Sequence, residues 1–310
     1  LLQVEGDLFD RKRTVPEPVL RRKVLQTRFL DPACGSGTFL VLILSRLQAL
    51  GRTLLVPEKD LLACLLRNVV GVDLNPLAVL TARVNYLLAI ADLLEHRTGD
   101  ITIPVYLADS VATPARGEDL FTAGTYRFAT AVGTFLLPAD LCRPDRFDRF
   151  CTALEECVRA EVSPEVFLAR VQSLAPEAEA TRLHAVYTTL QDLHRRGLNG
   201  LWARLLRNNF APLTVGQFDC VVGNPPWVNW EHLPDNYREE TRDLWARYRL
   251  AGTFTGGRPR LGAVKVDLSA LMTYAVADRL LKPGGRLGFV LTQSLLKTAG
   301  AGAGFRRFAT

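Results

Sequence analysis

Short apolar runs alternate with longer stretches of helical periodicity in two blocks of the chain, residues 24–110 and 215–308. The short runs have the length and composition of buried strands, whereas the longer stretches repeat apolar residues at intervals of three and four. Five strands are predicted, at Val24–Leu30, Asn68–Val72, Ile101–Leu107, Phe218–Val222 and Arg286–Thr292. Because helices separate the strands, we predict an α/β fold in which a parallel sheet has helices on both faces.

Three helices are predicted between these strands. An apolar helix covers residues 38–50, and a second begins at Asn75-Pro76, which offers an N-cap followed by proline at the first helical position. The second helix continues with apolar residues at helical spacing, namely Leu77, Leu80, Val84, Leu87, Leu88 and Leu94. The third helix, Asp267–Leu281, ends where Pro283-Gly284-Gly285 breaks the pattern.

Residues 111–217 have a different pattern and are predicted to form a mostly helical insertion between the third and fourth strands. The segment Tyr126–Leu137 is compatible with a hairpin or a loop. Helices are predicted around Phe147–Val158, after Ser163-Pro164 and over Glu177–Arg195, where Leu183, Val186, Tyr187 and Leu190 face inward. The sequence of this insertion points to no function.

The composition indicates a globular chain with a sizeable core, since 48% of its 310 residues are hydrophobic and 23% are charged. The longest apolar runs, such as Phe39–Leu44, are too short to span a bilayer. The six cysteines form no CxxC pair, so we expect reduced thiols in a cytoplasm and no metal site. A net charge of +6 mildly favours a polyanionic partner. Because the chain begins at Leu1 and its only methionine is Met272, we expect it to be a fragment of a longer protein.

A glycine-containing turn, Asp31 to Thr38, connects the first predicted strand to a helix. Glycines let a ligand approach the backbone, and the helix N-terminus offers free N–H groups to an anion. The dinucleotide fingerprint would need glycine in place of Leu40, and a phosphate loop would need a Gly-Lys step that the chain lacks. A nucleoside that carries a carboxylate, such as S-adenosylmethionine, fits better. The candidate cofactor-binding residues here are Asp31, Ala33, Cys34, Gly35, Ser36, Gly37, Thr38 and Phe39.

Polar residues also follow the other strands, and ligands of parallel sheets bind beyond the carboxyl ends of the strands. Asp73 is the candidate acceptor for the two ribose hydroxyls, and Asp109 is the candidate acceptor for the amino group of the cofactor's adenine. Leu74 is expected to cover one face of that base. The alternative is that these carboxylates only cap helices or stabilise turns at the strand ends.

The most informative stretch is Asn224-Pro225-Pro226-Trp227, directly after a buried strand. An exocyclic amino group is a poor nucleophile because its lone pair is delocalised into the ring. The Asn224 side-chain oxygen and the Pro225 carbonyl can accept from its two N–H bonds and free that lone pair, while the two prolines fix the backbone. Trp227 offers a flat surface on which an extruded base can stack. The alternative is a rigid turn with Trp227 in the core.

These motifs together resemble those of γ-class N6-adenine DNA methyltransferases of large restriction–modification and phage-defence enzymes. Motifs I, II, III and IV of that family correspond, in this order, to four segments of the chain: Asp31-Pro-Ala-Cys-Gly-Ser-Gly, Gly71-Val-Asp73-Leu-Asn-Pro, Leu107-Ala-Asp109 and Gly223-Asn-Pro-Pro-Trp227. Two further segments, Lys265-Val-Asp-Leu and Gly285-Arg-Leu-Gly-Phe-Val-Leu-Thr-Gln-Ser, resemble the family's later core motifs. The resemblance covers more than half of the chain. Asparagine at the first position of the Asn-Pro-Pro-Trp tetrad (residues 224–227) favours adenine as the target base in this family. Methylation at C5 of cytosine would need a nucleophilic cysteine in a Pro-Cys step, which the chain lacks. Cys34 is therefore interpreted as a packing residue.

The resemblance implies a Rossmann-like sheet, S-adenosylmethionine as cofactor, a flipped adenine in double-stranded DNA as substrate and a nucleoid-associated protein. It also implies an N-terminal lead-in (1–30), a cofactor-binding half (31–110), the insertion (111–217) and a catalytic half (218–310). A target-recognition domain is expected beyond Thr310, and a fused or separate nuclease or specificity subunit is a further expected partner. The Tyr-Thr-Pro-like segment that the family carries upstream of motif I is not found in residues 1–30.

Two other functions stay open at the level of sequence. One is methyl transfer to another planar amine, on a protein glutamine or an RNA base, and the other is a non-catalytic binding subunit. Trp227, Trp230 and Trp245, with Tyr237, Tyr248 and nearby arginines, suit either a strand-binding surface or helix packing. Gly252–Gly262 suits either a mobile loop over the substrate or a plain surface loop.

Overall fold

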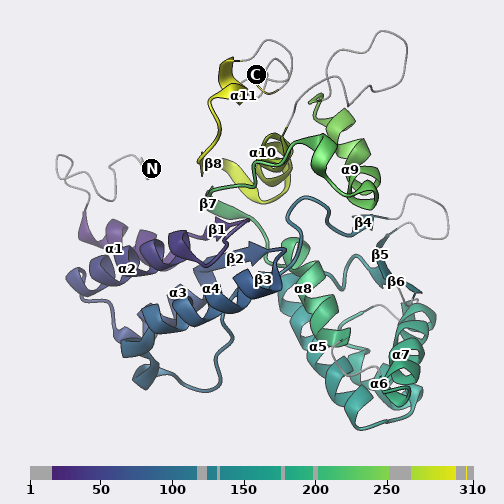
Figure 1. The fold of residues 1–310 in the computed structure, drawn as a ribbon. Coiled ribbons are helices and arrows are strands. Elements are labelled where there is room, and N and C mark those ends of the chain that lie inside the picture. Colours follow the sequence, from purple (N-terminus) through teal and green to yellow (C-terminus); the bar gives the residue numbers. More distant parts are fainter. Residues whose placement is uncertain are drawn as a thin grey trace. The chain divides into compact units, whose positions relative to one another are not determined.

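The computed structural model of the protein describes residues 16–116, 124–130, 133–175, 179–197, 202–250, 267–297 and 305. The chain divides into two compact units, each described by itself below (Figure 1). One unit combines Leu1–Ala112 with Gln217–Thr310, and the other is Thr113–Gly216. The sequence predicted an insertion over residues 111–217.

The first unit contains a five-stranded sheet in which every neighbouring pair of strands is parallel. The strand order is β3 (Val105–Leu107), β2 (Val69–Asp73), β1 (Phe29–Asp31), β7 (Phe218–Gly223) and β8 (Leu281–Phe289). From β1 the chain progresses first to β2 and β3 on one side, and later to β7 and β8 on the other. The order therefore reverses between β1 and β7, and such a switch point is where open α/β sheets bind ligands. The predicted α/β fold with a parallel sheet is confirmed.

Helices flank this sheet. They are α1 (Glu17–Gln26), α2 (Thr38–Thr53), α3 (Glu58–Asn68), α4 (Pro76–Ala89), α9 (Asp235–Arg247), α10 (Leu268–Arg279) and α11 (Ser294–Lys297), with short 3₁₀ turns η1 (Ala91–His96) and η3 (Trp230–His232). The predicted cap of α4 is present, since the Asn75 side chain accepts hydrogen bonds from the N–H groups of Leu77 and Ala78. The helices α2 and α4 both contact β2, and α4 also contacts β3, whereas α10 contacts β8.

Three predicted strand boundaries are wrong. The segment Val24–Gln26 belongs to α1, and β1 begins only at Phe29. A proline in the first turn of α1 and the Leu-Arg-Arg-Lys run favour a helix here, and Val24 is the buried residue of that helix. The strand β3 begins at Val105 and not at Ile101, since Pro104 has no N–H to donate to the ladder.

The third boundary error concerns β8, which starts at Leu281 and ends at Phe289, whereas Arg286–Thr292 was predicted. Leu281 pairs with Phe218 and Arg286 with Cys220, so the residues between them form a bulge around Pro283-Gly284-Gly285. Proline is tolerated there because β8 lies at the edge of the described sheet. The Pro-Gly-Gly step therefore bends the strand and does not end it.

The helix α4 begins where it was predicted but ends at Ala89, with Leu94 in η1. Its leucine-rich stripe faces away from the core. Leu77, Leu80, Val84, Leu87 and Leu88 are between 40% and 73% exposed. The side of α4 that packs on the sheet carries Val79, Ala82 and Tyr86 instead, and these three are buried with residues of α2 and β3. Helical periodicity located the helix, but it did not show which face the rest of the chain covers.

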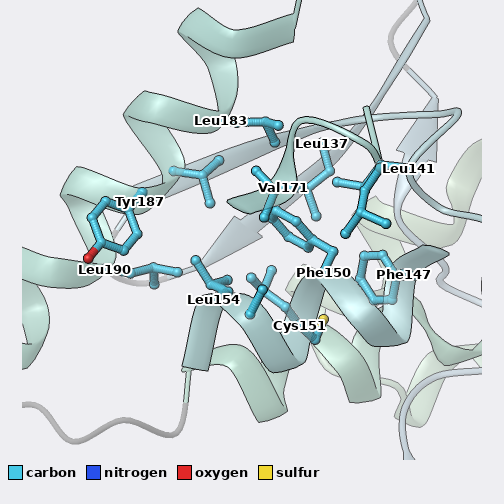
Figure 2. Packing of buried hydrophobic residues seen from close by; sticks show 14 of the residues in the cluster. Leu137, Leu141, Phe147, Phe150, Cys151, Leu154, Val171, Leu183, Tyr187 and Leu190 are labelled. Atoms are coloured by element: carbon cyan, nitrogen blue, oxygen red, sulfur yellow. The ribbon is translucent and has the colours of Figure 1, made fainter. Parts of the chain in front are cut away.

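The second unit has its own hydrophobic core. It contains an antiparallel sheet of β4 (Ala115–Arg116), β5 (Thr125–Thr130) and β6 (Gly133–Pro138), followed by α5 (Pro144–Arg159), α6 (Pro164–Val171), α7 (Ala180–Arg195) and α8 (Trp202–Thr214). Of the two interpretations of residues 126–137, the hairpin is correct. Figure 2 shows Phe150, Leu154, Leu183 and Tyr187 within this core, and the predicted inward residues of α7 are all buried.

This unit is electrically neutral, with twelve arginines, no lysine and twelve acidic residues, so the net charge of +6 belongs to the sheet-containing unit. All six cysteines of the chain are buried and unpaired. Among the described residues, no group of three or more His, Cys, Asp or Glu side chains comes together as a metal would require. The helices in that same part of the chain are too short or too polar to cross a membrane.

Candidate functional site

The turn between β1 and α2 is built by two glycines. Gly35 and Gly37 have φ values of 54° and 87°, a left-handed conformation that other residues adopt only with strain. A Cβ atom on Gly37 would lie 3.2 Å from Ala82 of α4, so the start of α2 packs tightly against that helix. Asn85 of α4 donates a further hydrogen bond of 2.9 Å to the carbonyl of Ser36. Contacts from Ala82 and Asn85 of α4 therefore hold the turn in place.

Cys34 fills the inside of the turn. Its N–H donates to the Val72 carbonyl at 3.0 Å, and its buried Sγ would lie 3.1 Å from a Cβ on Gly71. Burial raises the pKa of the Cys34 thiol far above its ordinary value. Cys34 thus packs as a small apolar residue and does not serve as a nucleophile. Of the other predicted residues of the turn, Ser36 and Thr38 are exposed, Ala33, Gly35 and Phe39 are partly buried, and Asp31 and Gly37 are buried.

Asp73 at the end of β2 closes over this turn. One of its carboxylate oxygens accepts a hydrogen bond of 2.8 Å from the Gly35 N–H, and the other accepts one of 2.8 Å from the Asn75 N–H. Asp73 therefore does stabilise a turn, as the alternative interpretation held, but it also joins the ends of β1 and β2. Leu74, the next residue, is exposed beside it.

Asp31 at the end of β1 is the most buried acidic residue of the site, with an exposed fraction of 1%. Its Oδ1 accepts from the Ala33 N–H at 3.2 Å, and its Oδ2 has no hydrogen-bond partner within the described part of the chain. Burial, and to a lesser extent the neighbouring Asp73, raises the pKa of Asp31 to about 7. A buried oxygen without a partner is costly, and it marks a position suited to a cationic ligand group.

Asp31 also touches the strand that leads into the tetrad. A Cβ atom on Gly223, the last residue of β7, would lie 2.6 Å from Oδ1 of Asp31. The ends of β1 and β7 can approach this closely only because residue 223 is glycine. The glycine turn and Asn224 are therefore neighbours at the switch point of the sheet.

The tetrad itself is held by the segment that follows β8. The Val290 N–H donates to the Gly223 carbonyl at 3.0 Å, and the Trp227 Nε1–H donates to the Val290 carbonyl at 3.3 Å. Pro225 is buried, Pro226 is partly buried, Asn224 is exposed, and the Trp227 side chain is 52% exposed. The indole is therefore fixed at its nitrogen, with much of its ring open to solvent, and it is not a core residue.

The chain after the tetrad is anchored by Asp267, the N-cap of α10. Leu268 donates its N–H to the Val228 carbonyl at 2.8 Å, and Asn229 forms an antiparallel bridge with Asp267. The buried Asp267 carboxylate accepts from the Ser269 hydroxyl and, at 3.4 Å, from the Thr292 hydroxyl. The tetrad is thus tied to the end of β8 and the start of α10.

Asp109, two residues past β3, lies at the same edge of the sheet. Its Oδ1 accepts from the N–H groups of Val111 at 2.6 Å and Ala112 at 2.9 Å. The Ser110 hydroxyl donates to the Pro32 carbonyl at 2.8 Å, which ties this loop to the glycine turn. The predicted residues Asp31, Asp73, Asp109 and Asn224 therefore all follow parallel strands of one sheet and share its carboxyl edge.

Residues 67–310 match the family described as Eco57I restriction-modification methylase. The chain belongs to this family. Residues 10–100 of the methylase chain also match the family described as MmeI, DNA-methyltransferase domain, and the five-stranded sheet is the Rossmann-like methyltransferase sheet that the sequence predicted.

No curated protein matches the methylase chain. One similar solved structure is described as that of a nuclease-deletion mutant of the Type ISP restriction-modification enzyme LlaGI in complex with a DNA substrate mimic. It has a TM-score of 0.47 and 14% sequence identity, and the alignment covers 93% of the methylase chain. The methylase chain spans only 17% of the length of that protein.

Two of the tryptophans that follow Trp227 in the sequence lie inside the fold. Trp230 and Trp245 of the methylase are buried and pack edge to face, with ring centroids 5.4 Å apart. Of the two interpretations of these tryptophans, packing is the correct one for Trp230 and Trp245, because their rings form a contact between η3 and α9. The segment Gly252–Gly262 lies outside the described residues.

Arg279 of α10 also organises the site, because its guanidinium donates to the carbonyls of Ser110 and Val111. No role was predicted for Arg279, since the sequence of α10 does not mark it as different from an ordinary surface position. Asp267, which lies in the Lys265-Val-Asp-Leu segment, carried a local signal as an N-cap before an apolar run.

Proposed function

We propose that this methylase binds S-adenosylmethionine beside its glycine turn and methylates N6 of an adenine flipped out of double-stranded DNA. The observation that carries the proposal is the contact between Asp31 and Gly223. It joins a turn suited to a carboxylate-bearing nucleoside to an Asn-Pro-Pro-Trp corner suited to an amino group on a planar ring. When bound, the cofactor supplies a methyl group activated by the positive charge on its sulfur.

The residues of the turn fit this cofactor. The first turn of α2 has no acidic residue and no side-chain cap, so its N–H groups are available to a carboxylate. Asp73 accepts from the ribose hydroxyls, and Leu74 covers one face of the base. Asp31, with one carboxylate oxygen that lacks a partner, provides negative charge for the cationic groups of the cofactor.

The tetrad fits the substrate. The side-chain oxygen of Asn224 and the carbonyl of Pro225 accept from the two N–H bonds of the amino group and raise the nucleophilicity of its nitrogen. Pro225 and Pro226 keep that carbonyl in a fixed direction. Trp227 stacks on the flipped base, and its hydrogen bond to Val290 prevents the indole from turning away.

A tritium-transfer assay tests the proposal. The purified protein is supplied with methyl-labelled S-adenosylmethionine and, separately, with DNA, RNA and protein, and the labelled nucleosides are identified by mass spectrometry. We expect label on DNA, as N6-methyladenine. Asn224→Ala should abolish the transfer while cofactor affinity stays within about fivefold, because Asn224 acts on the substrate. Label on N4 of cytosine, on RNA or on protein would overturn the assignment.

A further inference from the structure

The indole of Trp227 is held through the backbone at two points. Its Nε1–H donates to the Val290 carbonyl at 3.3 Å, and the carbonyl of the next residue, Val228, accepts from the Leu268 N–H at 2.8 Å. The first bond is made to the segment after β8, and the second comes from the first residue of α10. The direction of the ring therefore depends on how these two segments are held together.

Asp267, the N-cap of α10, fixes the start of that helix. One oxygen of its carboxylate, Oδ1, accepts from the Ala270 N–H at 3.3 Å and also from the Ser269 hydroxyl. Asn229 pairs with Asp267 in an antiparallel bridge, so the chain that follows the tetrad lies alongside this cap. The start of α10 and the residues after Trp227 are thus held together at Asp267.

The other carboxylate oxygen of Asp267 bonds to the segment after β8. Oδ2 accepts from the Thr292 hydroxyl at 3.4 Å, and Thr292 lies two residues after Val290. The Thr292 hydroxyl also shares a hydrogen bond of 2.8 Å with the Ser294 hydroxyl at the start of α11. At 3.4 Å the bond to Asp267 is long, so we expect it to contribute at the lower end of the range for hydrogen bonds to charged groups.

The burial of Asp267 distinguishes it from a simple helix cap. The residue is 7% exposed, and the donors to its carboxylate are two hydroxyls and one backbone N–H. A cap needs only one oxygen, which serine supplies as well as aspartate does. A buried carboxylate costs more free energy than a neutral side chain unless its oxygens are hydrogen-bonded. The second oxygen, and hence the bond to Thr292, is therefore what aspartate adds at this position.

We propose that Asp267 is a positioning residue that joins the start of α10 to the segment after β8 and thereby fixes the plane of the Trp227 indole for stacking on a flipped base. This inference rests on the proposed function. A ring that is already held in one plane loses less conformational freedom when a base stacks on it. The bonds of Asp267 described above go to α10 and to the segment after β8, and not to the glycine turn. Loss of Asp267 should therefore affect the substrate and leave the cofactor bound.

Asp267→Ser tests the inference, because serine keeps a cap for the Ala270 N–H but is too short to reach Thr292. We expect single-turnover methyl transfer to DNA to fall about fivefold, while the affinity for S-adenosylhomocysteine stays within about twofold. Asp267→Asn is the conservative variant, since its side-chain amide can still bond to the Thr292 hydroxyl. It should transfer methyl groups at a rate within about twofold of the wild-type rate.

The effect should pass through Trp227. In a Trp227→Phe background, Asp267→Ser should cost at most about twofold, because phenylalanine has no N–H to donate to the Val290 carbonyl. Hydrogen exchange of the Trp227 indole N–H, measured by NMR without DNA or cofactor, gives a second readout. This exchange should be faster in Asp267→Ser than in the wild-type protein, and Asp267→Asn should leave it unchanged.

Thr292→Val and Thr273→Val are a matched pair of variants. The first removes the hydroxyl that bonds to Asp267, and the second removes a buried hydroxyl that donates to the Ser269 carbonyl at 2.7 Å within α10. Thr292→Val should slow methyl transfer about threefold and speed the indole exchange. Thr273→Val should keep the wild-type values of both.

The inference is overturned if folded Asp267→Ser keeps the wild-type transfer rate and indole exchange, or if its loss is as large in the Trp227→Phe background. It is also overturned if Thr273→Val loses as much as Thr292→Val. Failure of the proposed function would look different. If the indole exchange responds as expected but the wild-type protein transfers no methyl group to DNA, the proposed function is overturned, and with it the stacking role, while the hold of Asp267 on the indole stands.

Discussion

Oδ1 of Asp31 lies where a side chain on Gly223 would begin, 2.6 Å from the position of its Cβ atom. This contact joins the strand that ends in the glycine turn to the strand that ends in the tetrad. Because Asp31 is buried, its carboxylate has little room to move aside. The spacing between the proposed cofactor and substrate sites therefore depends on one missing methyl group.

Gly223→Ala should separate these strand ends. We expect it to lower the free energy of unfolding by about 1–3 kcal/mol, as overpacking of a dense site does, and to reduce methyl transfer strongly. Chemical denaturation and the tritium assay measure the two effects. In an Asp31→Ala background the same substitution should cost less stability, because the clashing oxygen is gone. Equal costs in the two backgrounds would show that the contact does not limit the approach of the strands.

Asp31 should make stability depend on pH. Its pKa is raised to about 7 in the folded chain from an ordinary value of 3.8, so between these limits the folded state binds more protons than the unfolded state. The contribution of Asp31 to stability is therefore fully present below about pH 4 and is lost as the pH rises to 7. Asp31→Asn should raise the melting temperature at pH 8, by about 3 °C or more, and have little effect at pH 4.

The difference between the Asp31→Asn and wild-type melting temperatures, measured from pH 4 to pH 9, is the readout. A constant difference across this range would contradict the assigned titration. The same variant should bind S-adenosylmethionine more weakly at pH 8, since it removes the negative charge proposed to face the cationic groups of the cofactor. Stability and binding should thus change in opposite directions.

Trp227→Phe should separate stacking from orientation. Phenylalanine keeps an aromatic face but cannot donate to the Val290 carbonyl, so we expect the transfer rate to fall about threefold to tenfold with cofactor affinity unchanged. Trp227→Ala should lose considerably more, because base stacking is lost as well. Single-turnover methyl transfer and 2-aminopurine fluorescence of flipped DNA measure both variants. Equal losses in the two variants would mean that the ring face contributes nothing.

Asp73→Ala should weaken cofactor binding and also loosen the glycine turn. The substitution removes the proposed ribose acceptor together with the acceptor of the Gly35 N–H. We expect the affinity for S-adenosylhomocysteine to fall by about 30-fold or more, with faster hydrogen exchange at Gly35. Asp73→Asn keeps an oxygen for the Gly35 N–H and should restore the slow exchange without restoring the affinity. Unchanged affinity in Asp73→Ala would remove Asp73 from the cofactor site.

Sequence patterns located the strand ends because their signal is local. An apolar run followed by a polar residue and a turn marked Asp31, Asp73 and Asn224, and Asn75-Pro76 marked the start of α4. These features arise from backbone and side-chain preferences of neighbouring residues, which any single sequence carries.

Features that depend on distant partners were missed. The bulge in β8 forms only when that strand pairs with β7, and the outward stripe of α4 depends on which of its faces the sheet covers. Arg279 of α10 donates to the carbonyls of Ser110 and Val111, which lie far earlier in the chain. No periodicity in either segment encodes such a contact, so the supporting residues of the site appeared only in three dimensions.

The leucines on the outer side of α4 have a practical consequence for anyone who handles this chain in isolation. An exposed apolar stripe over three turns of a helix promotes self-association and nonspecific binding to chaperones and column matrices. We expect yield and monodispersity to improve when Leu77 and Leu88 are replaced by glutamate. Since neither residue contributes to the sheet core, the double variant should bind cofactor and transfer methyl groups as the wild-type protein does. It should also crystallise more readily than the wild-type protein.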